Sequence, residues 1–195
     1  MIKDLVLKNR SYRRFYQETD IKPETLREFV DIARLSASGG NVQPLKYILS
    51  YTRQKNDLIF PCLAWAGYLA DWQGPCEGER PSAYIIILGD TKISRSFGCD
   101  YGIAAQNILL SATEKGLGGC MLASIQKDKL RKALKISSQY EILLVLALGK
   151  PKETVVIDTV KNNDIKYWRD KKQIHHVPKR ALDNIIIDIL GLVKK

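Results

Sequence analysis

The chain has 195 residues, of which 45% are hydrophobic, and this is enough to close the core of one domain without disulfides or a metal. Its apolar runs, such as AYIIILG and NIIIDILGLV, fall short of the roughly 20 residues that cross a bilayer, so we expect no membrane segment. The formal net charge of +10 calls for an anionic partner: nucleic acid, a membrane surface or a phosphate-bearing cofactor.

The opening residues, MIKDLVLKNR, predict a helix and not an export signal, because charges are spread through their apolar positions. The four cysteines, Cys62, Cys76, Cys99 and Cys120, form no CxxC pair and have no histidine at metal-ligand spacing, so we expect no metal. We expect reduced, mostly buried thiols, with a reactive thiol at Cys120 as the alternative. These features favour a cytoplasmic protein.

The first half of the chain predicts a helix followed by two strands. Pro23 suits a first helical turn, and an apolar stripe follows it as far as Ser36. That stripe, at spacings i, i+3, i+4 and i+7, comprises Leu26, Phe29, Val30 and Ala33. After the turn-forming stretch ASGGN, KYILSY at 46–51 predicts a strand, and SAYIIILG at 82–89 predicts a buried central strand.

The second half predicts a central helix between further strands. Residues 100–115 are apolar around most of the helical circumference, which is typical of a helix covered on several sides, and glycines end it. A strand at 120–124, a helix at 127–134 and a buried strand at 142–149 are expected to follow. The alternation predicts a layered α+β fold.

Beyond Pro151 the residues as far as Pro178 are polar and predict an irregular segment. A short amphipathic helix is expected next, and its apolar face must be buried, for which a second subunit is the plausible surface. This face comprises Leu182, Ile185, Ile186 and Ile189. No repeat or linker interrupts the chain, so we expect residues 1–195 to form a single domain.

Three segments could bind a ligand. NRSYRRF at 9–15 places arginine forks and a serine hydroxyl together, which suits a phosphate, although an exposed basic helix end is the simpler explanation. SASGGNVQPL at 36–45 combines small residues with amide groups, yet an ordinary turn explains such a string too. GLGGCMLAS at 116–124 runs from a glycine-rich turn into a strand, and it lacks the context of a dinucleotide fingerprint or P-loop.

The order and spacing of these segments resemble the nitroreductase family, whose patterns are close to RRSxRxF, PSxxNxQPW and DxGxAxQNxxLxAxxxGLGxC. Here they read NRSYRRF, ASGGNVQPL and DYGIAAQNILLSATEKGLGGC, and VPKRAL from Val177 resembles the C-terminal phosphate-binding strand of many members. The resemblance implies a nitroreductase-like α+β fold with a mixed, mainly antiparallel sheet, helices on both faces and a central helix. It also implies a C-terminal tail that wraps the partner subunit.

The resemblance further implies a homodimer with FMN at the subunit interface. Arg10 and Ser11 would hold the FMN phosphate, Lys179 and Arg180 would close it from the C-terminal side, and Arg13 would lie beside the pyrimidine edge of the flavin. The other implied contacts are Ser38 and Asn41 of the partner subunit, and the backbone around Leu122, Ala123 and Ser124, which would face flavin N5.

The activity implied is hydride transfer from NADH or NADPH through flavin N5 to a small oxidant, such as a nitroaromatic or a quinone, with ping-pong turnover. No catalytic side chain is expected beyond Arg13 as an electrostatic stabiliser. The alternatives are another flavin reaction, namely reductive dehalogenation or flavin breakdown, and a non-catalytic flavin sensor. A nucleic-acid binder is disfavoured because the basic segments lack interleaved aromatic residues.

Some residues depart from the family pattern or carry no clear assignment. Asn9 replaces an arginine and Leu45 replaces the usual tryptophan. Residues 62–81 lie where relatives carry a variable cover over the flavin, and their aromatic side chains either stack on a planar substrate or pack in the core or at an interface. These are Trp65, Tyr68 and Trp72; two further residues, His175 and His176, are expected to be structural.

Overall fold

The computed structural model describes residues 1–190 of the chain, and its main sheet has five strands in the order β1-β5-β3-β2, with β4 also paired to β5. All of these pairings are antiparallel, which confirms the expected mainly antiparallel sheet, and an isolated parallel bridge joins Ser11 to Gly119 of β4. The four predicted strands are confirmed within two residues at each end. The bounds are β1 (Phe15–Tyr16), β2 (Leu45–Ser50), β3 (Ala83–Asp90), β4 (Gly118–Leu122) and β5 (Tyr140–Pro151).

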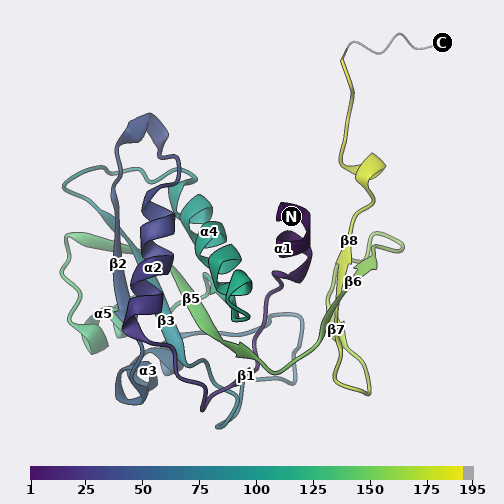
Figure 1. Ribbon diagram of the computed structural model, residues 1–195, viewed down its shortest axis with the longest axis horizontal. Coiled ribbons are helices and arrows are strands. Elements are labelled where there is room, and N and C mark those ends of the chain that lie inside the picture. The colour runs from purple at the N-terminus through teal and green to yellow at the C-terminus, as the bar shows by residue number, and fades with distance from the viewer. Residues whose placement is uncertain (191–195) are drawn as a thin grey trace.

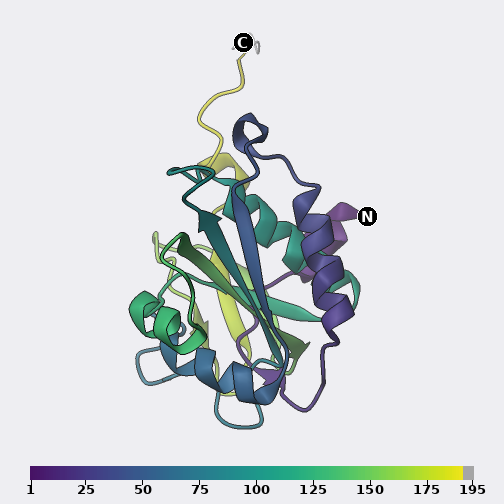
Figure 2. The same cartoon turned by 90° about the vertical axis from the view of Figure 1, so that its left-hand side faces the viewer.

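Helices cover both faces of this sheet, as predicted (Figures 1 and 2). One face packs against α2 and α4, with α1 beside α4, and the other face packs against α3 and α5. Because side chains alternate along a strand, Ile85 and Ile87 of β3 enter one core while Tyr84 and Ile86 enter the other. The helices are α1 (Ile2–Lys8), α2 (Pro23–Arg34), α3 (Arg53–Ile59), α4 (Asp100–Glu114) and α5 (Lys127–Leu134).

The segment after β5 is not irregular, as the sequence had indicated, but forms a second sheet of three strands in the order β6-β8-β7. β6 (Val155–Thr159) and β8 (His175–Lys179) are parallel, and β7 (Trp168–Arg169) is antiparallel to β8. Figure 1 shows this sheet beside the body of the domain, with α1 between it and α4. The expectation was wrong because these strands are short and because β6 pairs with β8 across the intervening residues 160–174, which no local pattern indicates.

The predicted tail helix is also wrong. Residues Leu182–Asn184 form a single 3-10 turn, and no helix follows as far as Leu190. The apolar side chains are exposed: Leu182 by 66%, Ile185 by 60%, Ile186 by 42% and Ile189 by 56%. A short amphipathic helix depends on packing of its apolar face, and a single chain supplies no surface for this one.

Residues 191–195 lie outside the described residues. They include the end of the expected single domain and of the run NIIIDILGLV. Within residues 1–190, no helix combines the length and the apolar character needed to span a bilayer.

Candidate functional site

A cavity of about 330 Å³ lies between the segment after α1, the face formed by α4 and β4, and strand β8. Four residues expected to hold a phosphate-bearing ligand line it together: Arg10, Ser11, Arg13 and Lys179. Its volume is within the usual range of ligand pockets, about 300 to 1,000 Å³. The structure therefore brings both ends of the chain to one site.

The backbone of the N-terminal segment is held against strand β4. Ser11 forms a bridge with Gly119, and the Tyr12 N–H donates to the Gly119 carbonyl at 3.0 Å. A Cβ at Gly119 would overlap the backbone carbonyl oxygen of Ala147, so only glycine lets β4 lie this close to β5. This close packing fixes the position of Ser11 and Arg13 relative to strand β4.

A buried carboxylate, Glu153, anchors the next part of the segment. It accepts hydrogen bonds from the backbone N–H of Arg13 and, at 3.2 Å, from that of Arg14. It also forms a 3.0 Å ion pair with the Arg169 guanidinium, and its side chain is only 1% exposed. The Arg14 side chain does not line the cavity, because it binds Glu79 through two hydrogen bonds of 2.5 and 2.7 Å.

The opposite wall is formed by alternate residues of β8, namely His175, Val177 and Lys179, which share one face of the strand. The His175 Nε2 atom lies 3.4 Å from Arg13 Nη1, and the Arg13 guanidinium lies over the Tyr167 ring at 5.1 Å. Burial, followed by the charges of Arg13 and Arg169, lowers the pKa of His175 to about 4, so the imidazole is neutral at pH 7. The sequence interpretation missed His175 and Tyr167 as cavity residues.

The neighbouring imidazole, His176, faces away from the cavity and joins the strands of the second sheet. Its Nδ1 atom lies 2.7 Å from Asp158 of β6, and its Nε2 atom lies 3.5 Å from Asp170. The ring stacks on Trp168 at 4.8 Å. The hydrogen bond with Asp158 is the largest of the effects that raise the pKa of His176 above its ordinary value of 6.5.

We therefore expect the second sheet to lose stability as the pH rises. A raised pKa in the folded state gives stabilisation that is fully present below about pH 6.5 and is lost as the pH rises through the raised pKa. Hydrogen exchange of the β6 and β8 amides, corrected for intrinsic rates, should show this loss in the parent chain and not in His176→Gln. The same pH dependence in both proteins would contradict the assignment.

Several predicted residues do not line the cavity of their own chain. Arg180 is exposed and donates to Asn163 Oδ1 at 3.1 Å. Leu122 is buried in the core, and Met121 reaches the cavity instead because it points to the other face of β4. Ala123 and Ser124 follow β4 with exposed side chains, and the Ser124 carbonyl accepts the Ala64 N–H at 3.0 Å.

Ser38 belongs to a second cavity, of about 150 Å³, between α2, β2 and α4. Its hydroxyl donates to Asp100 at 2.6 Å and accepts the Gln43 N–H at 2.9 Å. Asn41 lies in the same loop and accepts a 3.0 Å hydrogen bond from the Gln43 side chain. Leu45, at the position of the usual tryptophan, lines this second cavity, whereas Asn9 lines the first.

The aromatic residues of 62–81 pack against other parts of the chain. Trp65 is 8% exposed and contacts Phe60, with ring centroids 5.7 Å apart. The Arg169 guanidinium lies over the Trp72 ring at 4.2 Å, and Tyr68 contacts the Tyr167 ring at 4.9 Å. This segment therefore contacts the same C-terminal residues that surround the Arg13 side chain.

The thiols only partly match the expectation. Cys62 and Cys120 are buried, but Cys76 and Cys99 are exposed. Cys120 is buried, and this burial raises the pKa of its thiol to about 12, which disfavours the alternative of a reactive thiolate at this position.

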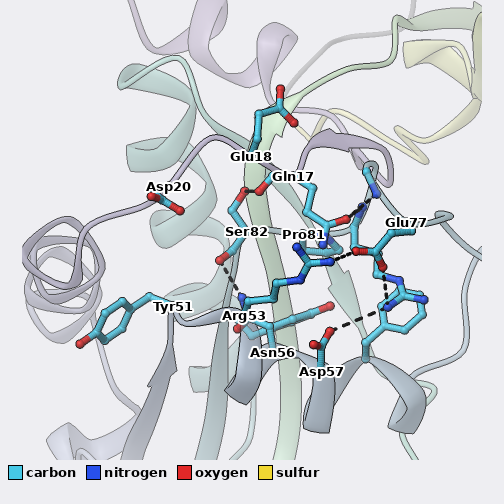
Figure 3. Close-up of a pocket in the computed structure, with 14 residues that line it drawn as sticks. Gln17, Glu18, Asp20, Tyr51, Arg53, Asn56, Asp57, Glu77, Pro81 and Ser82 are labelled. Carbon is cyan, nitrogen blue, oxygen red and sulfur yellow. Dashed lines mark hydrogen bonds and ion pairs between the residues drawn. The ribbon is translucent and has the colours of Figure 1, made fainter.

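Another cavity of about 330 Å³ lies beside α3, between the loop after β1 and residues 77–82 (Figure 3). Both of its arginines are already paired within the chain, since Glu77 binds Arg53 and Arg80. None of the residues expected to bind a cofactor lines it. We therefore place the functional site at the cavity of Arg10 and Arg13.

Comparison with known proteins agrees with this architecture. Residues 6–72 and 79–150 match the family model described as Nitroreductase family. The chain belongs to the nitroreductase family. Its relatives include an Archaeoglobus fulgidus protein, provisionally named an NADH dehydrogenase/NAD(P)H nitroreductase, which is 26% identical over 148 residues, covering 72% of this chain and 80% of the relative.

Solved structures of nitroreductase-family proteins share the fold. A family member from Streptococcus pneumoniae superposes with a TM-score of 0.68 at 18% identity, covering 97% of this chain and 100% of that one. A structure from Clostridium difficile, described as an FMN-dependent nitroreductase, superposes with a TM-score of 0.64 at 22% identity, covering 84% of this chain and 92% of that one.

Proposed function

We propose that this nitroreductase-family chain is a homodimeric FMN-dependent oxidoreductase that transfers hydride from NADH or NADPH to a small oxidant such as a nitroaromatic or a quinone. The observation that carries the proposal is the convergence of Arg10, Ser11 and Arg13 with Lys179 on one cavity. The names of the relatives from Archaeoglobus fulgidus and Clostridium difficile support the same cofactor and donor.

The residues present fit FMN. The cationic side chains of Arg10 and Lys179 and the Ser11 hydroxyl suit a phosphate, and the Arg10 Nε atom is buried without a hydrogen-bond partner in the part of the chain that the structure describes. Apolar and aromatic side chains suit a flat ring system, and those lining the cavity are Leu109, Met121, Tyr167 and Val177. A ligand with both a phosphate and a ring system therefore matches a cavity that has both basic and apolar lining residues.

When bound, FMN supplies the redox chemistry by accepting hydride at N5 and passing it on to the oxidant. The chain contributes binding and electrostatics. Arg10, Ser11 and Lys179 would hold the phosphate, and the Arg13 guanidinium would stabilise the negative charge that develops at the N1 and O2 edge on reduction. Glu153 and Tyr167 hold Arg13 on the cavity wall before any ligand binds.

We also propose that a second subunit completes the site. Ser38 and Asn41 of the partner subunit would contact the flavin, since in their own chain they lie away from the cavity. Arg180 would close the phosphate site from the C-terminal side, and the backbone from Leu122 to Ser124 would face flavin N5. The exposed tail of one chain would wrap its partner. The free cysteines agree with a cytoplasmic location.

The absorbance spectrum of the purified protein tests the proposed function. We expect a yellow protein whose flavin bands bleach anaerobically on addition of NADH or NADPH, and denaturation should release FMN. A basic cluster built for a terminal monophosphate disfavours FAD. Recovery of FAD as the main flavin, or of no flavin even after reconstitution with FMN, would contradict the proposal.

A further inference from the structure

The cavity is surrounded by positive charge, and one buried carboxylate lies behind it. Its charged lining residues are Arg10, Arg13 and Lys179, with no carboxylate among them. Glu153 does not line the cavity, but it binds the backbone of Arg13 directly and pairs with Arg169 at 3.0 Å. The ion pair with Arg169 and the bond to the Arg13 backbone fix this carboxylate, which is 1% exposed, in place behind the cavity.

The electric field of Glu153 reaches the strand that lines the cavity. Burial raises the pKa of the Cys120 thiol in β4, the positive charge of Arg13 lowers it, and the negative charge of Glu153 raises it. Met121, the next residue, lines the cavity. The Cys120 side chain lies in the core on the other face of β4, but Glu153 binds the backbone of Arg13 beside this strand, and the two side chains carry opposite charges.

We infer that Glu153 is the positioning residue of the flavin site: it holds Arg13 against the cavity and lowers the reduction potential of the flavin bound there. The inference rests on the proposed function. Reduction adds negative charge to the ligand, and a fixed negative charge nearby opposes this. The same carboxylate fixes the backbone of Arg13 and Arg14, so it limits how far the favourable Arg13 charge can move.

Arg169 provides the opposite charge in the same pair. Its side chain is 9% exposed, held between Glu153 and the face of Trp72. Removing the charge of Glu153 leaves Arg169 uncompensated, whereas removing the charge of Arg169 leaves Glu153 uncompensated. The two changes should therefore shift the flavin potential in opposite directions, which a loss of packing alone would not do.

The test compares Glu153→Gln, Arg169→Gln and the double variant, each reconstituted with FMN. In Glu153→Gln the reduced flavin should bind about tenfold more tightly relative to the oxidised flavin, which raises the potential by about 30 mV for a two-electron couple. Arg169→Gln should lower the potential by a similar amount, and the double variant should return close to the parent value. Spectroscopic titration against dyes of known potential measures all of these.

Glu79→Gln is the matched control, because Glu79 also binds an arginine of the N-terminal segment, Arg14, but neither residue lines the cavity. The bonds from Arg14 lower the pKa of Glu79 to about 2, so this variant should lower Tm while leaving the flavin potential unchanged.

Potentials equal to the parent value in both Glu153→Gln and Arg169→Gln would overturn the inference and reduce Glu153 to a structural role. If Glu153→Gln does not fold, the downward shift in Arg169→Gln and its reversal in the double variant decide the question. A parent protein that binds no FMN would instead contradict the proposed function. If the parent binds FMN normally and the variants keep its flavin reduction potential, only the inference is contradicted.

Discussion

Replacing Arg13 with alanine is expected to slow flavin reduction about 100-fold, the scale on which removal of one charge-stabilising donor acts. FMN affinity should fall by less, roughly tenfold or under, because the guanidinium matters most once negative charge has developed on the ring. Arg13 lines the cavity beside an aromatic ring and an imidazole, since its side chain contacts Tyr167 and His175.

Stopped-flow reduction by NADH or NADPH and a titration of the apoprotein with FMN separate the two effects. Arg14→Ala is the control, since Arg14 is the next residue yet binds Glu79 outside the cavity. It should lower stability and leave the reduction rate near the parent value. If Arg13→Ala abolishes FMN binding while the residual holoenzyme reduces at the normal rate, Arg13 is a phosphate ligand and the assignment is wrong.

Introducing Ile185→Asp together with Ile189→Asp is expected to turn a homodimer into monomers and to lower FMN affinity in parallel. Both side chains are more than half exposed in the single chain. Burying them with Leu182 and Ile186 against a partner is worth on the order of 6 kcal/mol before association costs are subtracted. If the loop of Ser38 completes the partner's site, dimerisation and FMN binding are thermodynamically linked.

Sedimentation velocity and FMN titration on the double variant test this prediction. Leu58→Asp is a suitable control, because Leu58 is also exposed but lies on α3, across the main sheet from the N-terminal helix and the tail (Figure 1). It should stay dimeric and bind FMN normally. Monomers of the double variant that bind FMN as tightly as the parent would contradict the shared site.

The sequence predicted the elements whose patterns are local. β3 and α4 are each buried by neighbours on several sides, and this burial requires an apolar sequence that can be recognised locally. The tail could not be predicted in the same way. Its apolar spacing has helical periodicity, but no surface of the single chain packs against it.

The cavity residues also divide into those that a local motif predicted and those that it did not. Arg10, Ser11 and Arg13 were found because they form one contiguous motif, and Lys179 was found through the resemblance of VPKRAL to a strand of the family. Glu153 was missed because its partner Arg13 is distant in sequence, and His175 was missed because strand β8 was not predicted. One signal was available: Glu153 is a carboxylate among basic residues two positions after a buried apolar strand, and a buried carboxylate needs a cationic partner.

Two adjacent histidines of β8 limit the pH range in which the C-terminal sheet is most stable. His175 faces the cavity with a pKa lowered to about 4, so it favours the folded sheet fully above about pH 6.5 and progressively less as the pH falls toward 4. His176 faces the two aspartates with a raised pKa and favours folding fully only below about pH 6.5. The strand that carries Lys179 to the ligand is thus best formed near neutrality, and it loosens in acid and in alkali for opposite reasons.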